Sequence, residues 1–188
     1  MRKSIILAIL ALSVPAFAQD GTISGTVDAK PSKFLKDTII FVKSAPVKVT
    51  PRTVEIDQKN MEFDPHIVLI AVGDTVKFHN HDKVDHNVMS NDGHYDLGTH
   101  GTGETMDHVF PAEGVFAQVC KIHPEMLAYV FVGQNRFSAF VDDKGSFTID
   151  GVPAGSYELD IWNPKLKAAP QQITVGASAT TVKFSLAR

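Results

Sequence analysis

The chain has very little cysteine: Cys120 is the only one among 188 residues. A single cysteine excludes a disulfide within the chain. After residue 18 no apolar run approaches the roughly 20 residues that a membrane-spanning helix needs, so no transmembrane segment is expected there. The 18 basic side chains do not outnumber the 21 acidic ones. The basic surplus typical of nucleic-acid-binding proteins is therefore lacking, and no nucleic-acid partner is expected.

The first 18 residues have the pattern of a secretory signal peptide. Arg2 and Lys3 precede an apolar run over residues 5–12, and Ala16-Phe17-Ala18 is a small-x-small cleavage site. We expect cleavage after Ala18 and a periplasmic location. Because an exported protein meets oxidising conditions, a free thiol there is at risk unless it is buried or bound to a metal. Cys120 is therefore either an inert core residue or a metal ligand.

Apolar residues recur with a period close to two along most of the chain, which is typical of β-strands. Turn signals rich in glycine, proline and aspartate separate these runs. No window after residue 18 keeps the 3.6-residue period of an amphipathic helix. The sequence predicts an all-β fold of sandwich architecture. The clearest runs are Val54–Ile56, Ile67–Ile70, Val76–Phe78, Val115–Val119 and Tyr129–Val132.

Cys120, His123 and Met126 lie within a seven-residue run, which brings a thiolate, an imidazole and a thioether together. These donors suit copper, and one Cys with two His and a weak axial Met is the pattern of electron-transfer copper sites. A second histidine must then come from elsewhere. Six of the eight histidines lie between His79 and His108. His86, just after an expected strand, is the best candidate.

Residues 52–132 resemble a cupredoxin of the plastocyanin/amicyanin group. The resemblance rests on motifs in the family's order, and Cys-x-x-His-Pro-x-Met is a short ligand loop typical of amicyanin. It implies a Greek-key β-sandwich and one type 1 (blue) copper ion. The motifs are Phe63-x-Pro65, Val72-Gly73-Asp74-Thr75-Val76-x-Phe78-x-Asn80, His86-Asn87-Val88, Gly103-Glu104, Phe110-x-x-x-Gly114-x-Phe116 and the ligand loop.

The same resemblance implies the roles of individual residues. The copper ligands would be His86, Cys120, His123 and Met126. Asn87 would tie the two ligand loops together by hydrogen bonding, and His123 would be the surface port for electrons. The sequence departs from the family at Asp85, where relatives carry proline, and at Glu125, where amicyanin-type loops carry an aromatic residue.

The segment after residue 134 contains neither His nor Cys and carries Asp-x-x-Gly-x-Phe-x-Ile and Val-Pro-x-Gly-x-Tyr-x-Leu. It resembles carboxypeptidase-regulatory-like (transthyretin-type) β-sandwich modules. The opening strands of such modules match Thr22–Val27 and Thr38–Val42, on the far side of the copper segment. We predict that residues 21–49 and 134–188 form one β-sandwich into which the cupredoxin domain, 52–132, is inserted. The alternative is that 21–49 extends the sheet of the middle domain.

Together these features predict a periplasmic one-electron carrier that cycles one copper ion between Cu(I) and Cu(II), and not an enzyme. Its partner would be a redox protein such as a c-type cytochrome or a periplasmic oxidoreductase, and the protein is expected to be a monomer. Copper oxidases and nitrite reductases need further histidine-rich copper sites, and a binuclear copper centre needs two cysteines. The alternative function is copper sequestration or delivery by the His- and Met-rich stretch 79–108, which otherwise is a polar surface loop.

Overall fold

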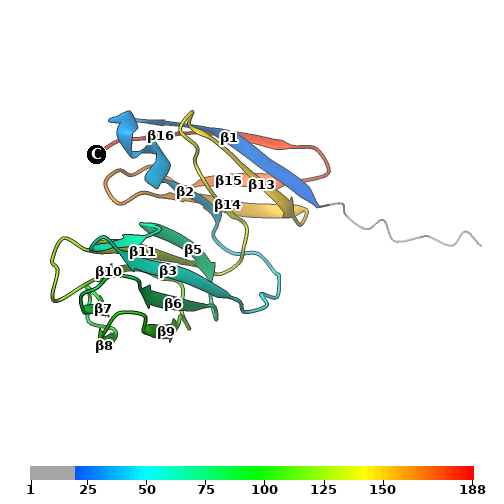
Figure 1. The fold of residues 1–188 in the computed structure, drawn as a ribbon. Coiled ribbons are helices and arrows are strands. Elements are labelled where there is room, and N and C mark those ends of the chain that lie inside the picture. Colours follow the sequence, from blue (N-terminus) through cyan, green and yellow to red (C-terminus); the bar gives the residue numbers. More distant parts are fainter. Residues whose placement is uncertain (1–19) are drawn as a thin grey trace, which may run out of the picture.

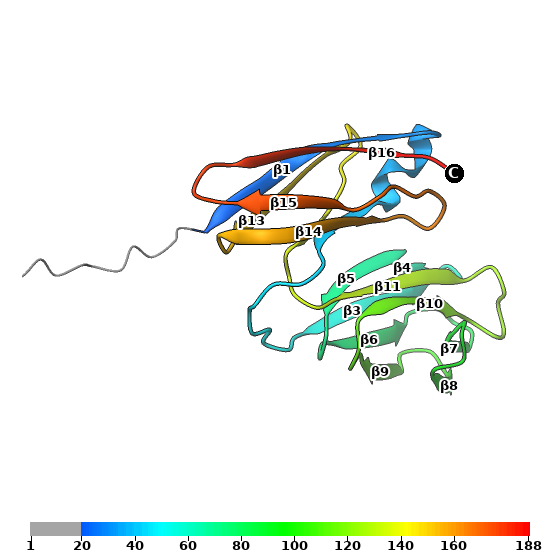
Figure 2. The same ribbon diagram turned by 180° about the vertical axis from the view of Figure 1, so that it is seen from behind.

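The computed structural model describes residues 20–188, and the predicted signal peptide lies outside them. The described chain is nearly all β-structure, which confirms the predicted fold class, and it has one short 3₁₀ helix, η1 (Ser32–Asp37). Within residues 20–188 no helix is long and apolar enough to cross a membrane. The strands form two stacked β-sandwiches (Figures 1 and 2).

One sandwich, which we call the terminal sandwich, contains strands from both ends of the described chain. Its first sheet has the order β13-β1-β16 and its second the order β12-β2-β14-β15. β1 pairs with β16 in parallel and with β13 antiparallel. The strands are β1 (Gly21–Ala29), β2 (Ile39–Val42), β12 (Ser138–Phe140), β13 (Ser146–Val152), β14 (Gly155–Trp162), β15 (Gln171–Val175) and β16 (Thr180–Leu186).

The second sandwich, which we call the central sandwich, is built from the residues between β2 and β12. Its sheets have the orders β5-β11-β10-β7-β8 and β4-β3-β6-β9. The strands are β3 (Thr53–Lys59), β4 (Glu62–Asp64), β5 (Ile67–Ala71), β6 (Thr75–Asn80), β7 (His86–Ser90), β8 (Asp96–His100), β9 (Thr105–Val109), β10 (Gly114–Val119) and β11 (Leu127–Gly133). All five apolar runs named above lie within these strands.

Strand β11 shows how the two sandwiches are joined. Successive side chains of a strand point to opposite faces. Ala128, Val130 and Val132 accordingly face the core of the central sandwich, which also contains Cys120 and Met126. Tyr129 and Phe131 face the other way and contact the terminal sandwich. An apolar seam therefore lies between the sandwiches, made of Ile39, Phe41, Ile67, Leu69, Val115, Tyr129, Phe131 and Trp162.

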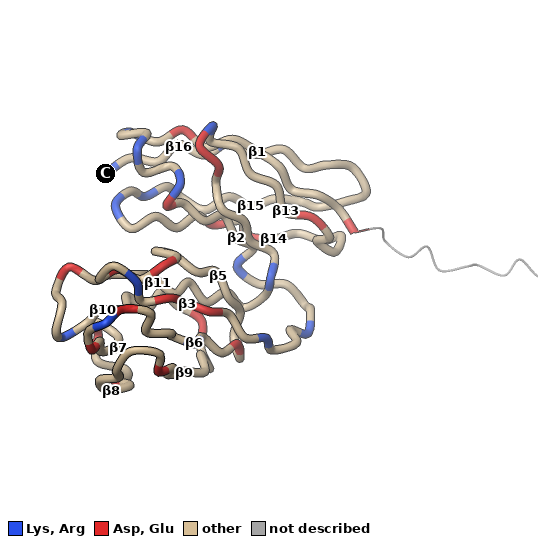
Figure 3. Tube along the Cα trace, viewed as in Figure 1, with Lys and Arg blue, Asp and Glu red and all other residues tan. Residues whose placement is uncertain are grey.

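The chain crosses between the sandwiches twice, after β2 and after β11, and the two crossing segments lie side by side (Figure 1). Asn135 donates a hydrogen bond to the carbonyl of Val42, and Arg136 donates one to the carbonyl of Thr50. Figure 3 shows lysine and arginine scattered among aspartate and glutamate along both sandwiches. The fold thus places both crossings at one end of β11 and the Cys120–Met126 loop at the other.

Candidate metal centre

Three predicted donors meet at the end of the central sandwich. His86 at the start of β7, and Cys120 and His123 after β10, offer donor atoms that all lie within 4.8 Å of one another. The Nδ1 atoms of His86 and His123 are 3.1 Å apart, and Sγ of Cys120 is 3.9 Å from Nδ1 of His123. Metal–nitrogen bonds of about 2.0 Å at the tetrahedral angle place two imidazole nitrogens about 3.3 Å apart. The donor set therefore fits a single metal ion.

The loop before His86 is held by Asn80, the last residue of β6. The Asn80 side-chain amide donates to the carbonyls of Val84 and His100, and its oxygen accepts the backbone N–H of Asp82. Asn80 is buried, so these bonds are shielded from water. The result is a fixed entry of the chain into β7, which presents His86 to the site.

Asp82 orients the His86 ring. One oxygen of its carboxylate lies 2.9 Å from Nε2 of His86, and a carboxylate there favours the tautomer in which Nε2–H donates and Nδ1, near Cys120 and His123, keeps its lone pair. The backbone N–H groups of Asn60 and Met61 also donate to the Asp82 carboxylate. Burial alone would raise the pKa of Asp82, but the hydrogen bonds from Met61, His86 and Asn60 outweigh burial and lower it. Asp82 is thus a carboxylate hydrogen-bonded to a histidine of the candidate donor group.

Asn87 connects the two ligand segments. Its backbone N–H donates to Sγ of Cys120 over 3.3 Å, and its side-chain oxygen accepts the N–H of Lys121. Its side-chain amide donates to Asp96, which also pairs with the Lys121 ammonium. Lys121, Asn87 and the Gly98 N–H together lower the pKa of Asp96 to about 2, so this carboxylate is charged at neutral pH. The hydrogen bond between ligand loops that the family resemblance implies is present.

The four predicted ligands differ in exposure. Cys120 and His86 are buried, Met126 is fully buried in the same apolar cluster as Cys120, and His123 is half-buried. A neutral thiol packs well in such a cluster. A charged thiolate would need a partner there, and the two imidazoles and the Asn87 N–H surround it.

Family comparison decides the nature of this region. Residues 51–133 match the model of the copper binding proteins of the plastocyanin/azurin family. This part of the chain is a cupredoxin domain. Copper is the metal that the family binds, and the donors brought together here suit it. Residues 132–183, which run from the end of β11 into β16 of the terminal sandwich, match the model of polysaccharide lyase family 4, domain II.

Solved structures similar to part of this chain include several copper proteins. A purple cupredoxin from Nitrosopumilus maritimus is 29% identical, with a TM-score of 0.39 over 42% of this chain and 98% of that one. A reduced amicyanin variant is 25% identical, with a TM-score of 0.40 over 43% of this chain and 81% of that one. A copper-containing nitrite reductase from Thermus scotoductus is 24% identical, with a TM-score of 0.43 over 50% of this chain and 25% of the enzyme. No curated protein matches the chain.

The remaining histidines of the cupredoxin domain lie outside the donor group. The rings of His79, in β6, and His81, just after it, stack on each other. His79 lies beside Glu55, and His81 lies beside Asp57. His108 stacks on Tyr95, and His94 lies near Asp92. His100 pairs with His86 across β7 and β8 and is buried, and burial lowers its pKa. Among residues 20–188 no second group of three such donors comes together.

Sequence reasoning missed Asp82 and Asp96. Neither belongs to the motifs that carry the family resemblance, and both act through contacts made by folding. The one available signal for Asp82 is its position four residues before His86 in a segment of turn-forming residues. Asp96 has no such signal, because it reaches Asn87 from the neighbouring strand β8.

Proposed function

We propose that the protein is a one-electron carrier with a single type 1 copper ion held by His86, Cys120, His123 and Met126. The observation that supports this most strongly is the meeting of the three donors His86, Cys120 and His123 in a cupredoxin domain. When bound, copper would supply the Cu(I)/Cu(II) couple. With Met126 as the fourth protein donor, no coordination position remains open for a substrate, which favours a carrier over an enzyme.

The protein's own residues account for the other requirements of a carrier. Asp82 and Asn87 hold His86 and Cys120 in place through hydrogen bonds on the side away from the metal, which limits rearrangement between oxidation states. His123 is half-buried, so we assign it as the route by which electrons enter and leave. We propose that the protein is exported and monomeric. Its partner would be a redox protein such as a c-type cytochrome or a periplasmic oxidoreductase.

The domain arrangement is also a proposal. Residues 21–49 and 134–188 would form one domain with the cupredoxin domain, 52–132, inserted. The pairing of β1 with β13 and β16, and of β2 with β12 and β14, supports it. The alternative, in which residues 21–49 extend the middle sheet, has no strand pairing in its favour among residues 20–188.

Copper reconstitution of the full chain tests the proposed function. We expect one copper per chain by metal analysis, an intense thiolate-to-copper charge-transfer band in the visible spectrum and a reversible one-electron wave in voltammetry. Cys120→Ser should abolish the band, while Ser90→Ala, a change away from the donors, should leave it intact. Several copper ions per chain in equilibrium dialysis would instead support sequestration or delivery. A colourless copper complex would rule out the type 1 site.

A further inference from the structure

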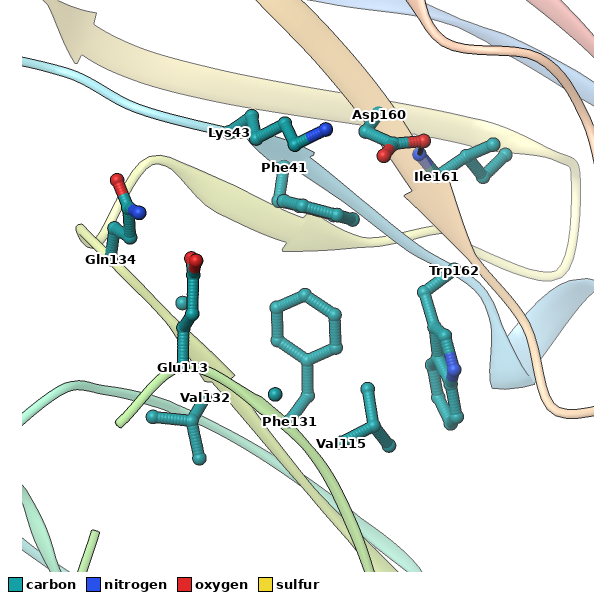
Figure 4. A pocket seen from close by; sticks show the side chains of 12 residues that line it. Phe41, Lys43, Glu113, Val115, Phe131, Val132, Gln134, Asp160, Ile161 and Trp162 are labelled. Atoms are coloured by element: carbon teal, nitrogen blue, oxygen red, sulfur yellow. Dashed lines mark hydrogen bonds between the residues drawn. The ribbon is translucent and has the colours of Figure 1, made fainter. Parts of the chain in front are cut away.

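A cleft lies between the two sandwiches, at the opposite end of β10 from the metal centre (Figure 4). Its volume is about 270 Å³. Gly114 lines it, whereas Cys120 follows the other end of the same strand. Because a strand rises about 3.4 Å per residue, these ends are about 20 Å apart. The cleft is therefore separate from the copper site.

The inner wall of the cleft is aromatic. Phe41 of β2 and Phe131 of β11 contact each other edge to face, with ring centroids 4.8 Å apart, and Trp162 of β14 lies 6.0 Å from Phe131. Figure 4 shows the Phe131 ring at the centre, with Trp162 to one side of it. Both sandwiches contribute a ring, so the wall exists only because they are packed together. Aromatic faces carry negative partial charge and attract cations.

The rim of the cleft has an excess of negative charge. Lys43, the one cation of the cleft lining, pairs with Glu158 over 2.8 Å, and the charges of Glu158, Asp160 and Glu113 together raise the pKa of its ammonium. Glu113 and Asp160 also lie at the rim, and neither forms an ion pair with any residue between 20 and 188. Figure 4 shows Glu113 on one side of the Phe131 ring and Asp160 above the rings, beside the end of the Lys43 side chain. The charge pattern is complementary to a cation.

We propose that this cleft binds a small organic cation, an aromatic amine of one ring whose ammonium lies between Glu113 and Asp160. The ring of the ligand would pack against Phe41, Phe131 and Trp162. The volume lies just below the range of roughly 300–1,000 Å³ typical of ligand sites, so it suits only a small molecule of one ring. The ammonium would interact favourably with the carboxylates and with the faces of the aromatic rings. An anionic ligand of the same shape meets more carboxylates than cations at the rim and is rejected.

Trp162 is the only tryptophan in the chain, so its fluorescence reports directly on the cleft. The test uses the full chain and three probes of similar shape: phenethylamine, the neutral phenethyl alcohol and the anionic hydrocinnamate. We expect phenethylamine to change Trp162 emission saturably, with a Kd of about 1 mM or below. The alcohol should bind more weakly and hydrocinnamate should not bind. Equal responses to all three probes, or no saturable response to phenethylamine, would overturn the proposal.

Charge-neutral variants test the role of the rim. Glu113→Gln and Asp160→Asn should each weaken phenethylamine binding about threefold, and the double variant about tenfold, because each removes one partly solvated ion pair. Asp143→Asn removes an equal charge from an exposed turn outside the cleft and is the matched control. Binding unchanged in the double variant, or weakened equally in the control, would contradict the proposed recognition. Circular dichroism of each variant verifies that the fold is retained.

Discussion

The guanidinium of Arg136 donates two hydrogen bonds, of 2.8 and 2.7 Å, to the fully buried carboxylate of Asp74. Asp74 lies between a turn and the start of β6 in the central sandwich, and Arg136 lies in the second crossing segment. The same carboxylate accepts the N–H groups of Arg52 and Ala71, and Arg136 also donates to the carbonyl of Thr50. One buried carboxylate therefore fastens both crossing segments to the cupredoxin domain.

Removal of Arg136 tests this attachment. Arg136→Ala leaves the Asp74 carboxylate buried without its main cation, and breaking a buried pair in this way costs about 3 kcal/mol. Arg52→Ala is the matched control, because Nε of Arg52 is 3.8 Å from the same carboxylate but the side chain is 56% exposed. A pair of that kind contributes about 1 kcal/mol or less. Equilibrium denaturation of both variants measures the difference, and equal losses would refute the assignment.

The same pair predicts a pH dependence of stability. Burial would raise the pKa of Asp74, but hydrogen bonds from Arg136, Ala71 and Arg52 outweigh burial and hold it below the ordinary value of 3.8. A lowered pKa stabilises the folded state above the ordinary value, and this stabilisation is lost as the pH falls from about 4 through the folded-state pKa. Asp74→Asn should be less stable at neutral pH and should lose less stability between pH 4 and 2 than the wild type. Denaturant titrations at several pH values verify this.

Asp82 should influence the copper potential. Asp82→Asn keeps the shape of the side chain but removes the negative charge of the group that is hydrogen-bonded to Nε2 of His86. We expect copper affinity to fall about tenfold, as is typical when a group that hydrogen-bonds to a metal ligand is replaced. The reduction potential should rise, because a nearby negative charge favours the more positive Cu(II). Voltammetry and Cu(I) competition titrations measure both effects.

Asp85→Asn is the control for the Asp82 variant. Asp85 is exposed, is adjacent to His86 in the chain and makes no hydrogen bond to its ring. It separates the effect of charge from that of the hydrogen bond. If both variants change affinity and potential equally, the hydrogen bond has no particular role.

Asn87 should determine how firmly the ligand loops are joined. Asn87→Ala removes the hydrogen bonds to Lys121 and Asp96 but keeps the backbone N–H that faces Sγ of Cys120. Copper affinity should fall about tenfold or more while the charge-transfer band persists. Asn91→Ala, at an exposed turn position, should change neither property. A fully retained affinity in Asn87→Ala would show that the loops hold together without this side chain.

Gly25 should be essential for the terminal sandwich. A Cβ at Gly25 would lie 2.2 Å from the carbonyl oxygen of Val182 and 2.9 Å from the Phe147 ring. Such overpacking costs about 1–3 kcal/mol or more, so Gly25→Ala should destabilise the terminal sandwich while leaving the copper band intact. Gly176→Ala is the control, because a Cβ there meets only open space. Thermal unfolding followed by circular dichroism and by copper absorption would separate the two effects.

The sequence by itself determined much of the local chemistry. The period-two apolar runs predicted the strands, because alternate side chains of a strand must face the core. Cys120, His123 and Met126 are so close in the chain that any compact loop brings them near one another. The family motifs then indicated His86 and Asn87, and the structure brings His86 to Cys120 and His123 and joins Asn87 to Lys121.

Tertiary structure alone decided the rest. Asp82 and Asp96 reach the ligand residues only after the loop before β7 and strand β8 have folded against them. Likewise Asp74 meets Arg136 only when the second crossing segment folds against the cupredoxin domain, and Phe41 meets Phe131 only when the two sandwiches pack together. The physical reason is that the spacing of apolar residues along the chain indicates which side chains are buried, but not which distant residues they pack against. The neighbours of Cys120 in the chain were enough to predict its role as a metal ligand; the carboxylates near the candidate site and the cleft between the sandwiches could not be predicted in this way.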